Sequence, residues 1–154
     1  MTEAAKQVVL QLQSLMVVEA KGSPTSEGLR SAFPSFRWSE AFASMLQGLA
    51  TALQTYWNTE AVPRIIEIEE PEAHDDYFRG PTIVVLGQSS GHATPVFLQG
   101  NSHLMIIDRY GGWAPTIHAQ GQLLLVSLQG SSYYHEINAK GGIHNLFTEI
   151  GRAH

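Results

Sequence analysis

The sequence predicts an α+β fold in which N-terminal helices pack on an antiparallel β-sheet. Early in the 154-residue chain, apolar side chains recur at the spacing of amphipathic helices. Later, short apolar runs alternate with glycine-containing turns, as in a sheet of about five or six strands. Helices first and strands second favour α+β over a doubly wound sheet. This length predicts one domain, helical over about 1–60 and β-sheet over about 64–150.

Two long helices are expected, over residues 3–20 and 39–57, because apolar residues mark one face of each segment. Their apolar stripes are Val8, Val9, Leu12, Leu15 and Met16 in the first, and Phe42, Met45, Leu46, Leu49, Leu53 and Trp57 in the second. Between them, residues 21–26 contain Gly and Pro and break the first helix. Residues 27–33 could form a short helix, and Pro63 follows the second long one.

The rest of the chain is read as strands joined by turns. The expected strands are 64–69, 82–86, 92–98, 103–108, 122–128, 133–137 and 143–150, the last of which could instead be a short helix. Residues 69–76 are acidic and polar, and they are expected to form a loop. No internal repeat is evident along the chain.

Composition narrows the possible partners and chemistry. The formal net charge is −5 and the pI about 5.7, which argues against nucleic acid or an anionic membrane as a partner. No apolar run is long enough to span a bilayer, and residues 1–6 do not resemble a secretory signal. We therefore expect the protein in the cytoplasm of the producing cell, or exported by a specialised secretion system. There is no cysteine, so thiolate metal sites and disulfides are excluded.

Two apolar runs around a Gly-Asn turn suggest a catalytic pair. His92 opens the first run and Asp108 closes the second, so a hairpin would bring them together. A three-residue loop over 99–101 places both side chains on one face. A two-residue turn at 100–101 places them on opposite faces. The sequence leaves both registers open, and an ordinary strand-end role for each residue is the simpler alternative.

The pattern Gly91-His92-Ala93, apolar run, turn, apolar run, Asp108 resembles the second half of papain-fold cysteine hydrolases, most of all the bacterial effector proteases and glutamine deamidases. The resemblance covers about 25 residues well and implies a papain-like arrangement of helices and sheet. It implies that His92 is the general base and Asp108 the residue that orients the His92 ring. It also implies a cysteine nucleophile at an early helix start, which this chain lacks.

Two serines could stand near the missing nucleophile. Ser26 precedes Gly28 and Leu29 much as the cysteine does in effector proteases, and Ser39 lies in a segment faintly similar to the papain Cys-Trp-Ala-Phe sequence. Ser26 is the first choice; the simpler alternative is that both serines cap helices. The thiol could have been replaced by mutation, the chain could be a natural pseudoenzyme, or the resemblance could be accidental.

Other chemistry is less well supported. His74-Asp75-Asp76 could bind a cation, but no tight ligand spacing accompanies it, and no metal or cofactor is expected. The leading hypothesis is therefore a papain-like hydrolase scaffold, protease or deamidase, without its nucleophile. The alternative is a non-catalytic binding protein, such as an immunity protein, chaperone or adaptor. In that case the acidic segment 67–76 would contact the basic surface of a protein partner.

Overall fold

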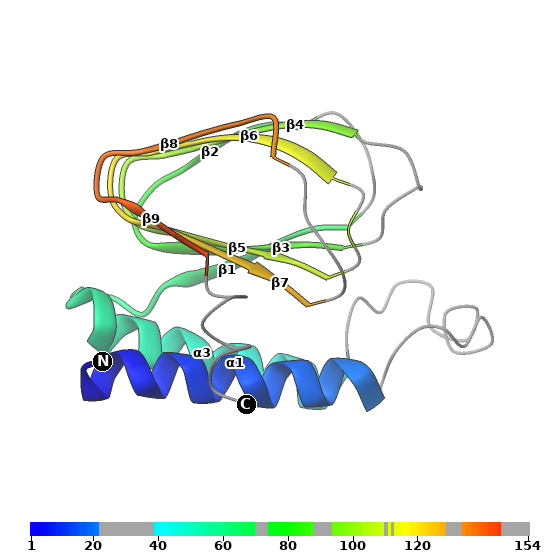
Figure 1. Cartoon of the computed structure of the whole chain (residues 1–154), viewed down its shortest axis with the longest axis vertical. Helices are drawn as coiled ribbons and strands as arrows, with labels where there is room; N and C mark the ends of the chain where they lie inside the picture. Colours follow the sequence, from blue (N-terminus) through cyan, green and yellow to red (C-terminus); the bar gives the residue numbers. More distant parts are fainter. Residues whose placement is uncertain are drawn as a thin grey trace.

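The computed structural model describes residues 1–21, 39–69, 74–87, 94–109, 111, 113–128 and 134–145. These residues form two helices followed by nine strands (Figure 1). The helices are α1 (Glu3–Lys21) and α3 (Glu40–Trp57). The strands are β1 (Arg64–Ile68), β2 (His74–Phe78), β3 (Thr82–Leu86), β4 (Thr94–Gly100), β5 (Leu104–Asp108), β6 (Trp113–Ala119), β7 (Leu123–Ser127), β8 (Glu136–Ala139) and β9 (Ile143–Asn145).

All pairings between these strands are parallel, and the strands form a β-solenoid. Odd-numbered strands make sheet A in the order β1-β3-β5-β7-β9, and even-numbered strands make sheet B in the order β2-β4-β6-β8. The chain thus alternates between the two sheets (Figure 1). The predicted antiparallel sheet and papain-like arrangement are therefore wrong. Strands that are consecutive in the sequence belong to different sheets, so they do not pair with each other as hairpins.

Each coil of the solenoid takes 18 to 22 residues, since successive aligned positions in sheet A are Arg64, Thr82, Leu104, Leu123 and Ile143. The structure therefore repeats, although the sequence shows no evident repeat. The physical requirement is the alternation of inward and outward side chains, which many sequences can satisfy.

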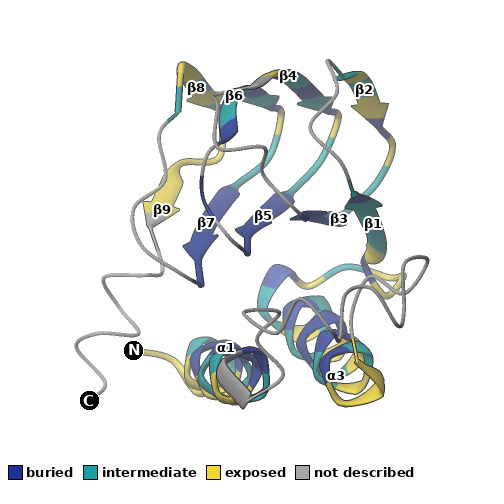
Figure 2. Ribbon diagram, turned by 90° about the vertical axis from the view of Figure 1, so that its right-hand side faces the viewer, coloured by how far each residue is buried: buried dark blue, intermediate teal, exposed yellow. Residues whose placement is uncertain are grey.

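The central strands of sheet A are buried on both faces, with sheet B above the sheet and α1 and α3 below it (Figures 1 and 2). In β3, Ile83 and Val85 pack against the helices, while Val84 and Leu86 face the interior of the solenoid. Strands β5 and β7 divide their side chains in the same way. This explains their continuous apolar sequences, which are typical of parallel strands covered on both sides.

The corners that lead from sheet B to sheet A stack closely on one another. The Gly141 amide donates to the Gly121 carbonyl at 2.8 Å, and the Gly121 amide donates to the Ser102 carbonyl at 3.0 Å. A Cβ atom on Gly141 would lie 2.6 Å from the backbone nitrogen of Gln122. Glycine is needed there because the preceding corner already occupies the space of a side chain.

Both long helices occur where periodicity predicts them. Ser39 caps α3, its hydroxyl accepting from the Phe42 amide at 3.0 Å. Asn58 ends α3 in the left-handed conformation with φ of 55°. The predicted short helix over 27–33 lies outside the described residues. No helix in the described ranges is long and apolar enough to cross a membrane.

Two strands were not predicted. Residues 74–78 form β2, although 74–76 were expected to belong to an acidic loop, and residues 113–119 form β6, in which every second residue is buried. The other expected strands occur with shifted ends, apart from 82–86, which matches, and the part of 143–150 that lies outside the described residues. The direction of the strands and their pairing partners were predicted wrongly.

The solenoid interior should be the most sensitive part of the fold to truncation. We expect Ile106→Ala to lower the free energy of unfolding by about 2–5 kcal/mol, because fully buried Ile106 leaves a cavity between the sheets. Leu10→Ala on α1 is the control, since Leu10 is 52% exposed and its truncation should cost at most about 0.5 kcal/mol. Urea unfolding measures both values, and equal effects would contradict the proposed packing.

Candidate binding surface

The structure separates the two runs that were predicted to form a hairpin. Residues 94–100 form β4 of sheet B, which pairs with β2 and β6. Residues 104–108 form β5 of sheet A, which pairs with β3 and β7. Neither hairpin register exists, because the two runs do not pair with each other. The turn between them is a corner of the solenoid.

Asp108 is a buried residue at the end of β5, aligned with Leu86 of β3 and Ser127 of β7. Its Oδ1 accepts a hydrogen bond from the Gly111 amide at 2.7 Å, which orders the corner after β5. This is an ordinary local role for an aspartate at a turn. His92 lies outside the described residues, so the His92–Asp108 pair stays a prediction. The hairpin that was expected to bring the two residues together is not formed.

Of the two serines considered as nucleophiles, the structure describes only Ser39. Ser26 lies outside the described residues. Ser39 is the N-cap of α3 and its hydroxyl binds the Phe42 amide, so the simpler alternative holds for this residue.

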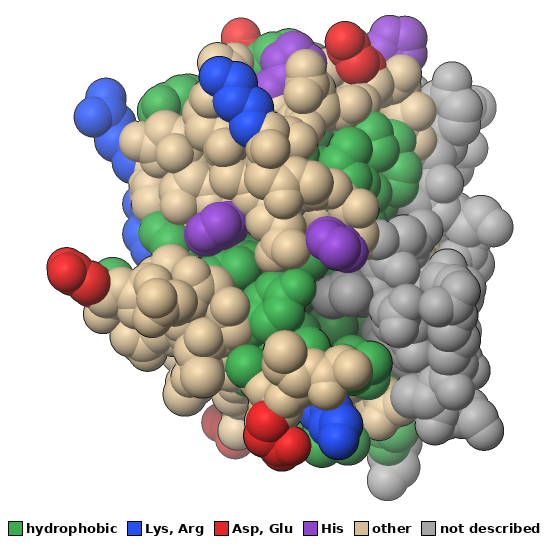
Figure 3. Space-filling view, turned by 60° about the vertical axis from the view of Figure 1, so that its left-hand side comes forward, with side chains coloured by type: hydrophobic (Ala, Val, Ile, Leu, Met, Phe, Trp, Pro, Cys, Tyr) green, Lys and Arg blue, Asp and Glu red, His purple; other side chains and the backbone are tan. Residues whose placement is uncertain are grey.

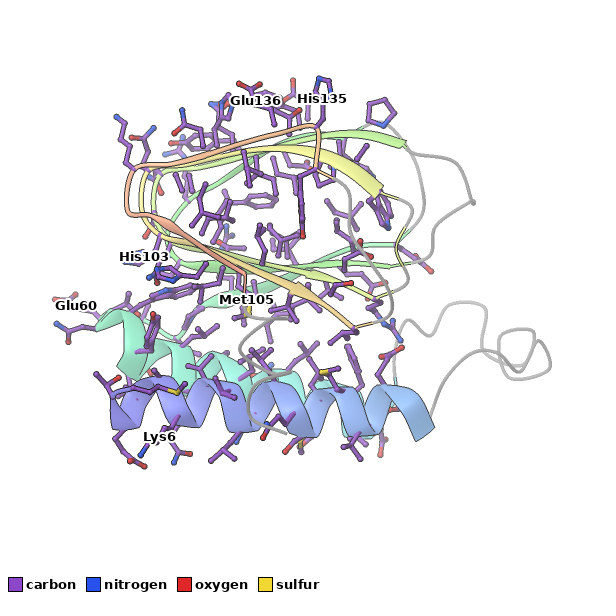
Figure 4. The ribbon with its side chains drawn as sticks, viewed as in Figure 1. Lys6, Glu60, His103, Met105, His135 and Glu136 are labelled. Atoms are coloured by element: carbon purple, nitrogen blue, oxygen red, sulfur yellow. The ribbon has the colours of Figure 1, made fainter. Side chains whose placement is uncertain are left out.

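The outer face of sheet B presents two rows of side chains across its strands. Register puts Asp75, Phe97, Thr116 and Glu136 in one row, and Tyr77, Gln99, His118 and Asn138 in the next. Figure 4 shows Glu136 and its neighbour His135 pointing away from the solenoid on this side. The His118 ring packs edge-on against Phe97, with centroids 5.2 Å apart. Its Nε2 is 3.8 Å from Glu136 and makes no hydrogen bond within the described chain.

Strand β2 forms one edge of sheet B and carries two adjacent acidic residues, Asp75 and Asp76. His74, Asp76 and Phe78 align with the inward-facing residues of β4, whereas Asp75 and Tyr77 align with outward-facing ones. His74 Nδ1 lies 3.3 Å from Asp76 Oδ2, and the Asp76 side chain is 41% exposed. Burial alternates along His74–Phe78, but polar and apolar residues do not, so the sequence carries no period-two signal for this strand.

The metal hypothesis for His74-Asp75-Asp76 gains no support. Within the described ranges, no three side chains of His, Asp or Glu come together as possible ligands. In an extended strand, Asp75 points to the opposite side from its two neighbours.

A second polar cluster joins the end of α3 to a corner of the solenoid. The Trp57 indole donates to the Gln122 side-chain oxygen at 2.9 Å and stacks on the His103 ring at 5.1 Å. The Gln122 backbone amide donates to His103 Nδ1 at 2.9 Å. Figure 4 shows His103 at this junction, between sheet A and the helix layer. Burial lowers the pKa of His103 below its ordinary value of 6.5, because the charged ring is less well solvated there.

At the other end of the helix layer, Arg109 forms a buried ion pair with Glu19 of α1. The shortest contact is 3.0 Å, and the two residues are only 5% and 4% exposed. The guanidinium also lies 4.5 Å from the centre of the Phe42 ring. These contacts link both helices to the corner after β5.

Comparison with known proteins adds no identification, since no family model, no curated protein and no solved structure matches this chain. The geometry described above therefore carries the functional argument.

The junction at His103 should make stability depend on pH. His103 has a lowered pKa when folded, so below about pH 6.5 the unfolded chain binds more protons there and stability falls. We expect His103→Asn, which keeps an acceptor near the Nδ1 position, to remove this contribution. Urea unfolding at pH 7.5 and pH 5.0 tests it. The wild type should lose more stability than the variant over this range, and equal losses would contradict the expectation.

The buried ion pair should be sensitive to loss of one partner. Glu19→Gln leaves the Arg109 charge buried without its carboxylate, and we expect a loss of about 3–5 kcal/mol in unfolding free energy. Glu3→Gln, on an exposed turn of the same helix, should change it by less than about 0.5 kcal/mol. A Glu19→Gln protein as stable as the control would show that the pair is not formed in solution.

Proposed function

We propose that this chain is a protein-binding module that docks a basic, extended segment of its partner along the edge of β2. The observation that carries the proposal is an edge strand with adjacent carboxylates, Asp75 and Asp76, beside an exposed tyrosine. It corresponds to the binding-protein alternative from the sequence, with the docking place narrowed from a ten-residue acidic segment to one strand.

The edge of β2 offers backbone hydrogen-bonding groups. Strand β2 pairs with β4 on one side, and no strand in the described part of the chain pairs with its other side. An extended peptide can add to such an edge through main-chain hydrogen bonds, while its side chains provide specificity. A parallel solenoid supports this mode because each strand already presents a regular ladder to its neighbour.

The side chains on β2 favour a basic partner. Asp75 is exposed, and Asp76 is partly exposed beside His74. Tyr77 is 53% exposed, and its ring already accepts one cation, with the Arg79 guanidinium carbon 5.9 Å from the ring centre. Carboxylates and an accessible aromatic face both attract Lys and Arg side chains.

The same strand disfavours a second copy of this chain as the occupant. If β8 of one copy stacked on β2 of the next in the solenoid register, Glu136 would lie beside Asp75. The inward-aligned Asp76 would also meet the apolar Ile137. Charged residues at inward positions are a known way to prevent edge-to-edge association.

The hydrolase hypothesis is untested by these observations. Its argument rested on a hairpin that would bring His92 to Asp108, and that hairpin is absent. The binding proposal rests instead on residues that the structure describes.

The proposal predicts salt-sensitive binding of a basic strand-forming peptide. As a probe we would use a ten-residue peptide of alternating Lys and Val, with a Glu-Val peptide for comparison. We expect the Lys-Val peptide to bind and the Glu-Val peptide not to bind. Binding should weaken as salt rises from about 0.05 to 0.5 M, because the distance over which exposed charges attract each other falls below about 10 Å. Fluorescence anisotropy of labelled peptide gives the affinity.

Matched variants locate the binding edge. Asp75→Asn with Asp76→Asn should weaken binding by roughly two- to thirtyfold, because exposed ion pairs contribute about 0.2–1 kcal/mol each. Glu136→Gln, at the opposite edge of the same sheet, is the control and should have little effect. Equal losses in both proteins, or salt-independent binding, would overturn the proposal. An N-methylated peptide that binds equally well would exclude strand addition.

A further inference from the structure

A cavity of about 160 Å³ lies between the helix layer and sheet A. Its walls include Ala5 and Val8 of α1, Tyr56 of α3, Leu124 of β7 and His144 of β9. Figure 3 shows this side of the molecule, where a band of hydrophobic side chains lies between the solenoid and the helices, below two histidine side chains. The cavity is on the opposite side of sheet A from sheet B, and it is independent of the β2 edge.

The volume and lining limit what could enter. Val8 and Leu124 are almost completely buried, so the inner wall is apolar and well packed. An apolar cavity of about 150 Å³ in a protein can hold a benzene-sized molecule. The space therefore fits one six-membered ring or a branched alkyl group, and it is too small for a nucleotide or a long acyl chain.

Both polar side chains of the wall, those of Tyr56 and His144, can donate a hydrogen bond. The Tyr56 hydroxyl accepts from Gln122 Nε2 at 3.3 Å, which leaves its own proton available, and no acceptor for that proton occurs among the described residues. His144 is exposed, and an imidazole donates from one nitrogen when neutral and from both when protonated. The described wall contains no carboxylate. A ligand with an acceptor, and above all an anionic one, would complement these groups.

We propose that this cavity binds a small carboxylate with a compact apolar body, of the arylacetate or branched-chain type. The apolar body occupies the space between Ala5, Val8 and Leu124. The carboxylate stays at the wall formed by the Tyr56 hydroxyl and the His144 imidazole. Charge-assisted hydrogen bonds from these two donors orient the ligand and select it over a neutral or cationic molecule of the same shape.

Phenylacetate is a suitable probe, compared with toluene and benzylammonium, which share its ring. Titration of isotopically labelled full-length chain, followed by NMR, should show saturable binding with shifts at Ala5, Val8 and Leu124. Phenylacetate should bind about tenfold more tightly than toluene, and benzylammonium more weakly still. No saturation, or equal affinity for benzylammonium, would overturn the proposal.

Variants separate cavity binding from surface binding. Ala5→Leu should fill the space and abolish binding of phenylacetate and toluene, whereas Ala4→Leu, half-buried and outside the described wall, should leave both unchanged. Both substitutions keep a strong helix former in α1.

Tyr56→Phe and His144→Ala should each lower the affinity for phenylacetate about tenfold and leave the affinity for toluene unchanged. His144 is exposed, so its replacement tests the proposal even if Tyr56→Phe disturbs the contact with Gln122. Phenylacetate binding that withstands Ala5→Leu, or that neither donor variant changes, would exclude this cavity as the site.

Discussion

Sheet A has to bury both of its faces, and the arrangement of the rest of the molecule follows from that requirement. Its central strands carry apolar residues on both sides, so each face needs a cover. The inward face is covered by sheet B, which the same chain builds as it passes from one sheet A strand to the next. The outward face is covered by α1 and α3 (Figure 2). A solenoid of this length could not leave that second face to solvent, because apolar burial is the main favourable term in folding.

Polar interactions are concentrated where the layers meet at their ends. At one end, Trp57 and Gln122 connect α3 to a corner, and at the other, Glu19 and Arg109 connect α1 to the corner after β5. These bonds fix the direction of the helices relative to the strands, which non-directional apolar contacts alone would leave loosely defined. No element in the described part of the chain covers the outer face of sheet B, so this face and the β2 edge present solvent-accessible side chains.

The sequence predicted the helices well because their signals are local. Both apolar stripes, the Ser39 cap and the break after Asn58 can be read within a few residues. Strand direction depends on pairings about 20 residues apart, and the Gly-Asn corner at Gly100 and Asn101 is locally similar to a hairpin turn. The contrast between doubly buried runs such as Thr82–Leu86 and alternating ones such as Trp113–Ala119 was the available signal for two parallel sheets. At the candidate site, the sequence showed that residues 74–76 are acidic. Because charged residues are typical of loops, the strand that contains them was not predicted.

The near-constant coil length has a consequence for how such a molecule can change size. A segment such as residues 104–122 spans one complete coil, beginning in sheet A and ending at the next entry into sheet A. Duplicating it would add one strand to each sheet, lengthen the stack by about 4.8 Å, and leave every inward residue inward. Inserting a single residue within a strand would reverse the orientation of all residues after it in that strand. This architecture therefore tolerates growth in whole coils far better than it tolerates small insertions within its strands.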